Sequence, residues 1–396
     1  MTQSSLTAVR SDIGTPDAEL VGRATGLIPL IREYAAQGSE ARRVAPEVVK
    51  ALGEAGLFHL LVPTRLGGSG ATMRTTVDAV AEVARGDGST GWITALTSSA
   101  NGFTATFSEA AQQDMFGSNP KATSCGIFSP GKAEPVEGGY RISGRWPYAS
   151  GSFAADWATV GIALEDGEVA LALIPGEAFS IEPTWFVTGM RGSGSDTIVV
   201  EDHFVPKHRI QRFQEMAEGR YLTPYKDEHM ASIGFTSVAS AILVAPQVGM
   251  VRHALEITRE KLPAKPVAYT SFSQARQSAT HHLAVAKAAT NLHMAEMLLD
   301  RICLDIDQAA AEARRMDLEN RARIRNDTGV VAELCTQAID LLMSANGSGS
   351  FAEANVLSRI WRDSSIAARH AYVSTDIGRE AYGRVLLGNE ETTTVL

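Results

Sequence analysis

The chain has 396 residues, which is enough for two or three structural units around a sizeable buried core. Apolar residues make up 44% and charged residues 20%, so the composition is that of a globular protein rather than a disordered one. The net charge of −9, with basic and acidic residues interspersed, argues against a nucleic-acid partner, and no apolar run reaches the roughly 18 residues of a membrane span.

The first third of the chain is expected to be helical. Apolar residues recur at helical spacing across 18–30, and a glycine-rich loop over 64–72 precedes a further helix over 74–85. Residues 91–116 also have a helical pattern. We therefore predict an N-terminal helical domain over residues 1–118.

From about residue 119 the pattern changes to short β-branched or alternating runs bounded by turn residues. These runs are YRISGRW, WATVGIAL, VALALIP and TIVVEDHFVP. Such runs are typical of antiparallel strands. The sequence predicts a middle antiparallel β domain over residues 119–226.

Long helical stretches return after residue 227. The predicted helices cover 232–262, 274–315, 318–345 and 354–388, and Pro246 is expected to kink or interrupt the first. Four long helices after a sheet favour a C-terminal four-helix bundle over residues 227–396. The fold class is α+β, because helices, a sheet and a bundle follow one another without βαβ alternation.

The three cysteines, Cys125, Cys303 and Cys335, are far apart and form no CxxC pair, which argues against a disulfide framework or a zinc cluster. The nine histidines show no metal-ligand spacing, so we predict no metal site. The N-terminus lacks the layout of a signal peptide. These features predict a soluble, cytoplasmic protein with no membrane partner.

Two glycine-rich segments, RGSGSD (191–196) and NGSGSF (346–351), match neither a Walker loop nor a dinucleotide fingerprint. Their backbone N–H groups could approach an anion, or they could simply be turns. Trp146, Tyr148 and two further aromatic residues fall within twelve positions, 146–157. These rings could form the wall of a planar cofactor site or the core beneath a sheet.

His370 lies among polar and charged residues in the segment SRIWRDSSIAARHAYVSTD. A histidine in such a place could be a base with a tuned pKa or a structural helix residue. The chain has no GxSxG elbow and no acidic pair suited to glycoside chemistry.

Four separated segments, in the same order, resemble the acyl-CoA dehydrogenase fold. They are LGEAGLFHLLVPTRLGG (52–68), GGYRISGRWPYASG (138–151), TWFVTGMRGSGSDTIVVEDHFVP (184–206) and NGSGSFAEANVLSRIWRD (346–363). More closely, they resemble its flavin-dependent monooxygenase branch, also called group D, the oxygenase components of two-component aromatic hydroxylases. The resemblance implies the three-part fold predicted above and a flavin site shared between the sheet and the bundle.

The resemblance also implies roles for individual residues. The isoalloxazine would be lined by Trp146, Pro147, Tyr148 and Ser150, with Ser150 as a catalytic residue near flavin N5. The flavin or its phosphate would run along Thr188, Arg191 and Ser193. The cofactor tail would be reached, often across a subunit interface, by Arg276, Gln277, Ser348, Gly349 and Ser350. His370 would lie beside the substrate as a catalytic residue, to deprotonate a phenol or to stabilise the oxygenated flavin.

The implied activity is that of a reduced-flavin-dependent monooxygenase. It would hydroxylate a small aromatic or polycyclic phenolic substrate with O2, through a C4a-hydroperoxyflavin. The chain shows no nicotinamide-binding unit, so a separate NAD(P)H:flavin reductase would supply FADH2 or FMNH2. The family resemblance further implies a homotetramer.

Two departures from the family pattern define the alternatives. No glutamate motif like the acyl-CoA dehydrogenase base follows residue 363, which argues against a dehydrogenase. The segment SSANGFTATF (98–107) lacks the histidine that some aromatic hydroxylases carry there, which leaves room for an N-hydroxylase acting on an amine or amino sugar. A helical scaffold that kept the fold but lost the flavin is the non-enzyme alternative.

Overall fold

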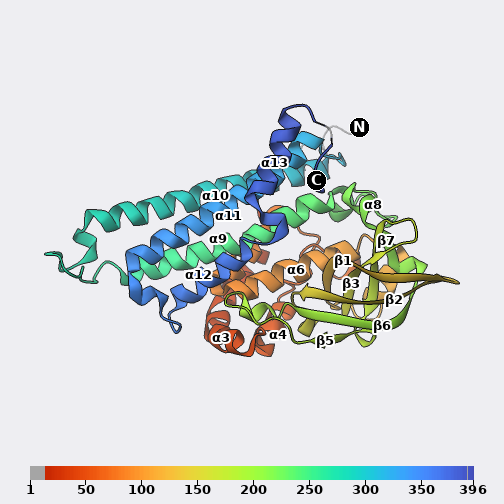
Figure 1. Cartoon of the computed structure of the whole chain (residues 1–396), viewed down its shortest axis with the longest axis horizontal. Coiled ribbons are helices and arrows are strands. Elements are labelled where there is room, and N and C mark those ends of the chain that lie inside the picture. Colours follow the sequence, from red (N-terminus) through yellow and green to blue (C-terminus); the bar gives the residue numbers. More distant parts are fainter. Residues whose placement is uncertain (1–13, 390) are drawn as a thin grey trace.

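The computed structural model describes residues 14–389 and 391–396 (Figure 1). The N-terminal part is helical, as predicted. Its helices are α2 (Ala18–Gly26), α3 (Ile28–Ala41), α4 (Pro46–Glu54), α5 (Met73–Gly86), α6 (Gly88–Thr104) and α7 (Glu109–Phe116). The helical stretch predicted over 91–116 comprises α6 and α7, and the Ser108 side chain caps the first turn of α7 by accepting from Ala111 N.

The middle part forms one seven-stranded sheet. Its strands are β1 (Ser124–Val136), β2 (Gly139–Ala149), β3 (Trp157–Ala163), β4 (Val169–Pro175), β5 (Ser180–Glu182), β6 (Asp196–Pro206) and β7 (Ile210–Arg212). Their order is β5-β6-β2-β1-β3-β4-β7. The sheet is mixed, which corrects the antiparallel prediction: β1 and β3 pair in parallel, with Cys125 opposite Ala158. The parallel pair arises because β2 and β3 lie on opposite sides of β1, and the chain crosses between them after Ala149.

The C-terminal part is a bundle of long helices. They are α9 (Phe235–Lys261), α10 (Ala279–Ala311), α11 (Leu318–Asn346), α12 (Val356–Ala367) and α13 (Thr375–Leu386), and a short α8 (Phe213–Ala217) precedes them. The first three match the prediction, and α9 runs through Pro246 without interruption. The fourth predicted helix is broken into α12 and α13, and the short 3-10 turn η9 (Ala371–Val373) lies between them. That break places His370 outside a helix.

Helix α9 is central to the molecule. Figure 1 shows it running from the sheet end into the bundle, with α10, α11 and α12 around it and the N-terminal helices against its other side. By length and composition α9 could cross a membrane, since it has 27 residues and a mean hydropathy of 1.3 in its most apolar window. However, 83% of that window is buried inside the chain, as in the core helix of a soluble protein.

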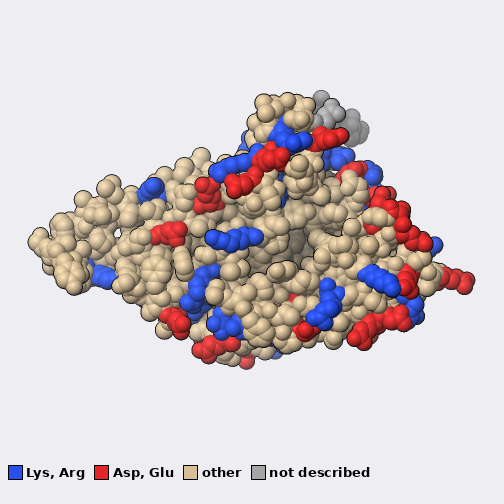
Figure 2. All heavy atoms as spheres, in the orientation of Figure 1, with Lys and Arg blue, Asp and Glu red and all other residues tan. Residues whose placement is uncertain are grey.

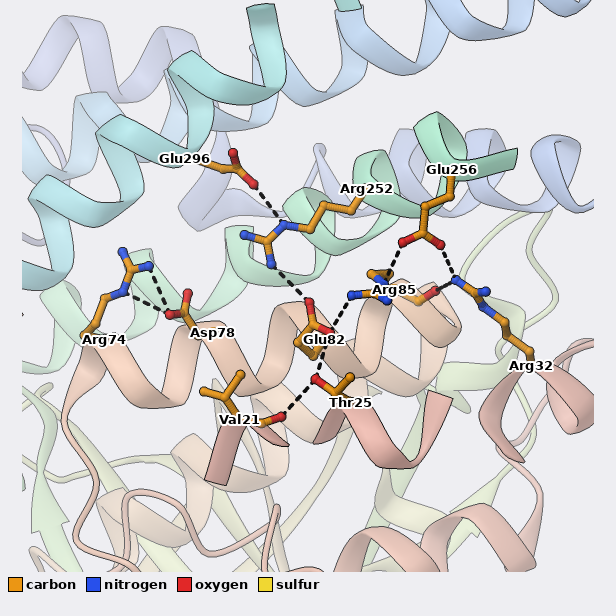
Figure 3. Close-up of polar contacts among 10 residues, drawn as sticks. All are labelled: Val21, Thr25, Arg32, Arg74, Asp78, Glu82, Arg85, Arg252, Glu256 and Glu296. Carbon is orange, nitrogen blue, oxygen red and sulfur yellow. Dashed lines mark hydrogen bonds and ion pairs between the residues drawn. The ribbon is translucent and has the colours of Figure 1, made fainter. Parts of the chain in front are cut away.

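A network of ion pairs joins the N-terminal helices to the bundle (Figure 3). Arg252 of α9 contacts Glu82 of α5 at 3.3 Å and Glu296 of α10 at 2.9 Å. Arg85 also binds Glu82, at 2.7 Å, and the Thr25 hydroxyl of α2 donates to the same carboxylate. Because Glu82 is buried, its three partners compensate a charge that would otherwise be costly to desolvate.

The last N-terminal helix ends at Phe116 and β1 begins at Ser124, while β7 ends at Arg212 and α9 begins at Phe235. The domain boundaries at residues 118 and 226 lie within these two connections and stay predictions. Figure 2 shows this face of the molecule hollowed near its centre, where the bundle meets the sheet.

Candidate active site

A cavity of about 690 Å³ lies between the sheet, α6 and the bundle. Its wall is mostly apolar and aromatic. The aromatic lining residues are Trp92, Phe103, Phe128, Tyr148, Trp185, Phe235, His370 and Tyr372. The polar groups include the Ser99, Ser129, Ser150 and Ser195 hydroxyls, the His370 ring, the Tyr148 and Tyr372 phenols and Arg369. None of the described lining residues is an Asp or Glu, so the wall presents no carboxylate to an electron-rich ring.

Hydroxyl groups at one wall form a buried hydrogen-bond series that we call the serine relay: Trp92, Ser150, Ser195, Ser193 and the Met190 carbonyl. The Trp92 indole N–H donates to Ser150 Oγ at 3.2 Å, and Ser150 Oγ lies 2.7 Å from Ser195 Oγ. Ser195 Oγ lies 2.7 Å from Ser193 Oγ, which donates to the Met190 carbonyl at 2.8 Å. All four side chains are buried, so water does not compete for these bonds.

Strained backbone shapes the same wall. Tyr148 and Met190 have φ angles of 68° and 52°, which residues other than glycine rarely adopt. Gly189 lies so close to α12 that a Cβ there would be 2.1 Å from the Arg362 carbonyl oxygen. The loop before β6 is thus pressed against α12, which brings Ser195 and His370 to one cavity.

His370 lines the cavity at the break between α12 and α13. Its ring lies edge-on to Trp92, with ring centroids 5.7 Å apart, and is stacked near Tyr372. Burial, together with the charge of Arg325, lowers the pKa of His370 to about 4, so the imidazole is neutral at pH 7. Its Nδ1 accepts from Tyr372 N at 3.3 Å, which assigns the proton of the neutral ring to Nε2.

Arg325 of α11 lies behind this turn. One of its terminal nitrogens donates to the Ala371 carbonyl at 2.6 Å, and its guanidinium lies 5.1 Å from the Tyr372 ring centroid. It is 3% exposed, and its Nε and Nη1 have no hydrogen-bond partner among the described residues. Burial lowers the pKa of Arg325 and raises that of Tyr372 to about 12, so the phenol stays protonated at neutral pH.

The structure brings Pro147, Tyr148, Ser150 and His370 together around the cavity, and their contacts with a flavin or substrate stay predictions. Trp146 is a correction. Its indole is fully buried in the core of the sheet, donates to the Gly161 carbonyl at 2.9 Å and fills the space left by Gly131 and Gly144. It therefore cannot wall the cavity, where Trp92 and Trp185 lie instead.

The residues expected along the flavin or its phosphate do not line the cavity. Ser193 is a correction, because it is fully buried behind Ser195 as part of the serine relay. Thr188 is exposed, and Arg191 donates its Nε hydrogen to the Ser39 carbonyl at 3.0 Å. A contact of Thr188 or Arg191 with a cofactor stays a prediction.

The residues expected at the cofactor tail lie at the far tip of the bundle, away from the sheet (Figure 1). They are Arg276 and Gln277 of the turn before α10, and Ser348, Gly349 and Ser350 after α11. The two segments lie together, since Lys265 donates to the Asn346 carbonyl and Ala275 packs with Ala345. Ser350 points inward and donates to the Gly347 carbonyl, whereas Ser348 and Gly349 are exposed.

Several lining residues were missed by the sequence argument. Phe128 and Phe235 are 107 positions apart in sequence, yet their rings lie edge-to-face at 5.1 Å in the cavity wall. Only tertiary packing joins them, so no local pattern marks them. Ser195 could have been found, because it lies within the GSGS motif already singled out.

The cavity fits a reduced flavin. Its volume is in the range of cofactor sites, about 300–1,000 Å³, and aromatic rings from several segments can enclose a planar ring system. The Ser150 hydroxyl at the wall can meet a ring nitrogen. Among the residues that the structure describes, no group of three or more His, Cys, Asp or Glu side chains is arranged as a metal site.

Known proteins share this architecture. Residues 27–117 match the acyl-CoA dehydrogenase N-terminal domain, and residues 241–375 match the acyl-CoA dehydrogenase C-terminal domain. The chain is 31% identical to the oxygenase component of the FADH2-dependent resorcinol hydroxylase of Rhizobium sp., over 95% of both chains. It is 30% identical to the flavin-dependent monooxygenase oxygenase subunit HsaA of Rhodococcus jostii, over 94% of this chain and 100% of the relative.

Solved structures agree. XiaF from Streptomyces sp., in complex with FADH2 and glycerol, superposes with a TM-score of 0.91 at 29% identity, over 100% of this chain and 99% of that one. The 3-HSA hydroxylase from Rhodococcus sp. gives a TM-score of 0.90 at 29% identity, over 96% of this chain and 99% of that one. With the fold, the cavity and these relatives in agreement, the chain belongs to the flavin-dependent monooxygenases of the acyl-CoA dehydrogenase fold, as an oxygenase component.

Proposed function

We propose that the enzyme hydroxylates an uncharged aromatic or polycyclic phenol in the cavity between sheet and bundle. As an oxygenase component of a two-component system, it works with a separate reductase and a small-molecule substrate. Bound reduced flavin supplies two electrons to O2, so that one oxygen atom enters the substrate and the other leaves as water. The observation that carries the proposal is the aromatic cavity with Ser150 and His370 in its wall.

The wall of the cavity excludes water from the reacting groups. Phe103, Phe128, Phe213 and Phe235 form a cluster of tilted and edge-to-face rings, and three of them line the cavity. An apolar lining of this kind suppresses wasteful loss of activated oxygen to water. It also favours a flat apolar substrate over an amino sugar, whose many hydroxyls would lack partners here.

His370 is the proposed catalytic residue on the substrate side. A histidine with a pKa of about 4 is a weak base toward a phenol, whose pKa is about 10. Its neutral ring carries the proton on Nε2, because Nδ1 accepts from Tyr372 N. Deprotonation of a phenol, one of the two roles expected for it, is therefore disfavoured. We propose a third role, donation of a hydrogen bond from Nε2 to the substrate oxygen, which stabilises the negative charge that develops there.

Ser150 is the proposed contact to flavin N5, and Pro147 and Tyr148 would flank the ring. This placement follows the resemblance and is supported by the position of all three residues in the cavity wall. Arg276, Gln277 and the 348–350 turn cannot serve the cavity of their own chain from the tip of the bundle (Figure 1). We propose that they reach the cofactor tail of a neighbouring subunit in a homotetramer. We also place the enzyme in the cytoplasm, where a reductase has access to NAD(P)H.

A substrate panel tests the proposed function. The protein, a generic flavin reductase, NADH, FAD or FMN, and phenols, fused-ring phenols, amines and acyl-CoA esters would be incubated in air. We expect products one oxygen atom heavier from the fused-ring phenols, detected by mass spectrometry. Oxygenation confined to amines, or dehydrogenation of an acyl-CoA ester without added reductase, would contradict the proposal.

A further inference from the structure

The serine relay has only one arrangement of hydrogens that keeps all of its bonds. A carbonyl only accepts, so the single Ser193 hydroxyl hydrogen goes to Met190. Ser195 must then donate to Ser193, and Ser150 must donate to Ser195. The Trp92 indole only donates, which agrees with Ser150 Oγ as its acceptor.

This arrangement determines what Ser150 can offer to the cavity. Its one hydrogen is used toward Ser195, and one lone pair is used by Trp92. The other lone pair remains, because no further hydrogen bond of Ser150 Oγ is found in the part of the chain that the structure describes. Ser150 therefore faces the cavity as an acceptor and needs a donor opposite it.

The two redox states of a flavin differ in this respect. The reduced ring carries a hydrogen on N5 and is a donor there, whereas the oxidised ring has a bare lone pair at N5 and only accepts. When Ser150 Oγ can only accept, it forms a hydrogen bond with the N5 hydrogen of the reduced ring. Opposite the oxidised ring, its lone pair faces the lone pair of N5, and two acceptors without a hydrogen between them are costly in a buried site. The preference does not come from Ser150 itself, since a free serine hydroxyl can rotate to donate.

We propose that Ser195 and Ser193 are positioning residues that fix Ser150 as a hydrogen-bond acceptor, so that the cavity selects reduced flavin over oxidised flavin. The inference rests on the proposed placement of flavin N5 at Ser150. With this selectivity, the oxygenase takes up the reduced flavin that another protein supplies and releases the oxidised flavin.

Two variants test this. Ser195→Ala removes the acceptor of the Ser150 hydrogen, and Ser193→Ala frees the Ser195 hydrogen to turn toward Ser150. In both, Ser150 can donate to oxidised N5. The matched control is Ser152→Ala, which removes a buried hydroxyl that has no hydrogen-bond partner among the described residues and lies outside the cavity and the relay.

The readout is the dissociation constant of oxidised FAD and, under anaerobic conditions, of reduced FAD. We expect the ratio of oxidised to reduced constants to fall about tenfold in Ser195→Ala and in Ser193→Ala, as for one hydrogen bond. A tenfold change equals about 30 mV in the midpoint potential of the bound two-electron couple. The control should keep the wild-type ratio. Thermal unfolding of each variant shows that it is folded.

If the ratio of the dissociation constants of oxidised and reduced FAD is the same in both relay variants as in the control, the inference is overturned and the proposed function stays intact. If one relay variant does not fold, the other decides alone. Failure of the wild-type protein to bind either FAD or FMN in either redox state would instead contradict the proposed function. The two failures are thus distinguishable.

Discussion

At the scale of single residues, the strand before the cavity shows how much the sequence could tell. Pro147, Tyr148 and Ser150 lie in the cavity wall. Trp146 does not: its indole lies in the core of the sheet with Ile142. A positive φ at Tyr148 and a register shift after Trp146 interrupt the alternation of side chains along the strand. No local pattern in the sequence marks that interruption, so the sequence did not separate Trp146 from Tyr148.

Replacing Trp146 by Phe tests that correction. The variant loses the hydrogen bond to the Gly161 carbonyl and part of the packing against Gly131 and Gly144. We expect a loss of about 1–3 kcal/mol in the free energy of unfolding, measured with urea. The affinity for reduced FAD should stay within about twofold of wild type, because the indole does not line the cavity. A twofold change corresponds to less than about 0.5 kcal/mol. A large loss of flavin affinity in a stably folded variant would show that the indole contacts the cofactor.

His370 has a pH signature. Burial and Arg325 lower the pKa of His370 to about 4, so its protonated form is absent in the neutral range. The pKa of His370 in the folded protein lies below its ordinary value of about 6.5. The neutral ring therefore makes its full contribution to the free energy of unfolding above about pH 6.5, and this contribution is lost as the pH falls toward 4. Product formation should therefore show no His370 limb between about pH 6 and 8.

Variants at position 370 check the assignment. His370→Ala should lower the yield of oxygenated product per NADH consumed by about tenfold to a hundredfold and raise the yield of hydrogen peroxide. His370→Gln, which retains an N–H donor, should recover part of the coupling. A wild-type limb near pH 6.5 that vanishes in both variants would point to a base with an ordinary pKa instead.

At the scale of helices and strands, the sequence predicted which segments are helix or strand better than it predicted their interruptions. Three of the long helices were expected, and the fourth is broken by η9 between α12 and α13. No Gly or Pro marks this break in the sequence IAARHAYVST. The break instead depends on tertiary contacts, since Arg325 of α11 binds the Ala371 carbonyl and the His370 ring caps Tyr372 N. The parallel pairing of β1 with β3 is likewise a long-range outcome.

The ion-pair network between α5, α9 and α10 makes a prediction at this scale. Arg252→Met removes one of three partners of the buried Glu82, whereas Arg32→Met removes the outer contact to Glu256 and a hydrogen bond to the Arg85 carbonyl (Figure 3). We expect about 1–3 kcal/mol of destabilisation for the first and less than about 1 kcal/mol for the second, because exposed pairs contribute little. Chemical unfolding of the two variants compares them, and equal losses would contradict a buried role for Arg252.

At the scale of the whole molecule, the bundle exposes apolar surface that a single chain leaves uncovered. On α10, Leu283, Met294 and Met297 are 72%, 40% and 59% exposed. Their spacing of 11 and 14 residues returns to one face of a helix with 3.6 residues per turn. Large exposed apolar stripes mark interaction surfaces. This face supports the proposed homotetramer, which would also bring the bundle tip of one subunit to another.

Charge on that stripe should disrupt assembly. The double variant Leu283→Glu, Met297→Glu is expected to sediment at a lower mass than wild type and to bind FAD more weakly, because the tail contacts would be lost. Leu387→Glu, which places a charge at an equally exposed leucine outside α10, is the control. A wild-type protein that sediments as a monomer at micromolar concentration would contradict the tetramer and the shared cofactor site.

The central claim is that this cavity transfers one atom of dioxygen to an aromatic ring. Its most direct test is a reaction of the protein, anaerobically reduced FAD and the best fused-ring phenol of the panel with isotopically heavy dioxygen, followed by mass spectrometry of the product. We expect one heavy oxygen atom per product molecule, with the yield reduced in His370→Ala. A product whose new oxygen comes from water, or consumption of the heavy dioxygen entirely as hydrogen peroxide, would contradict it.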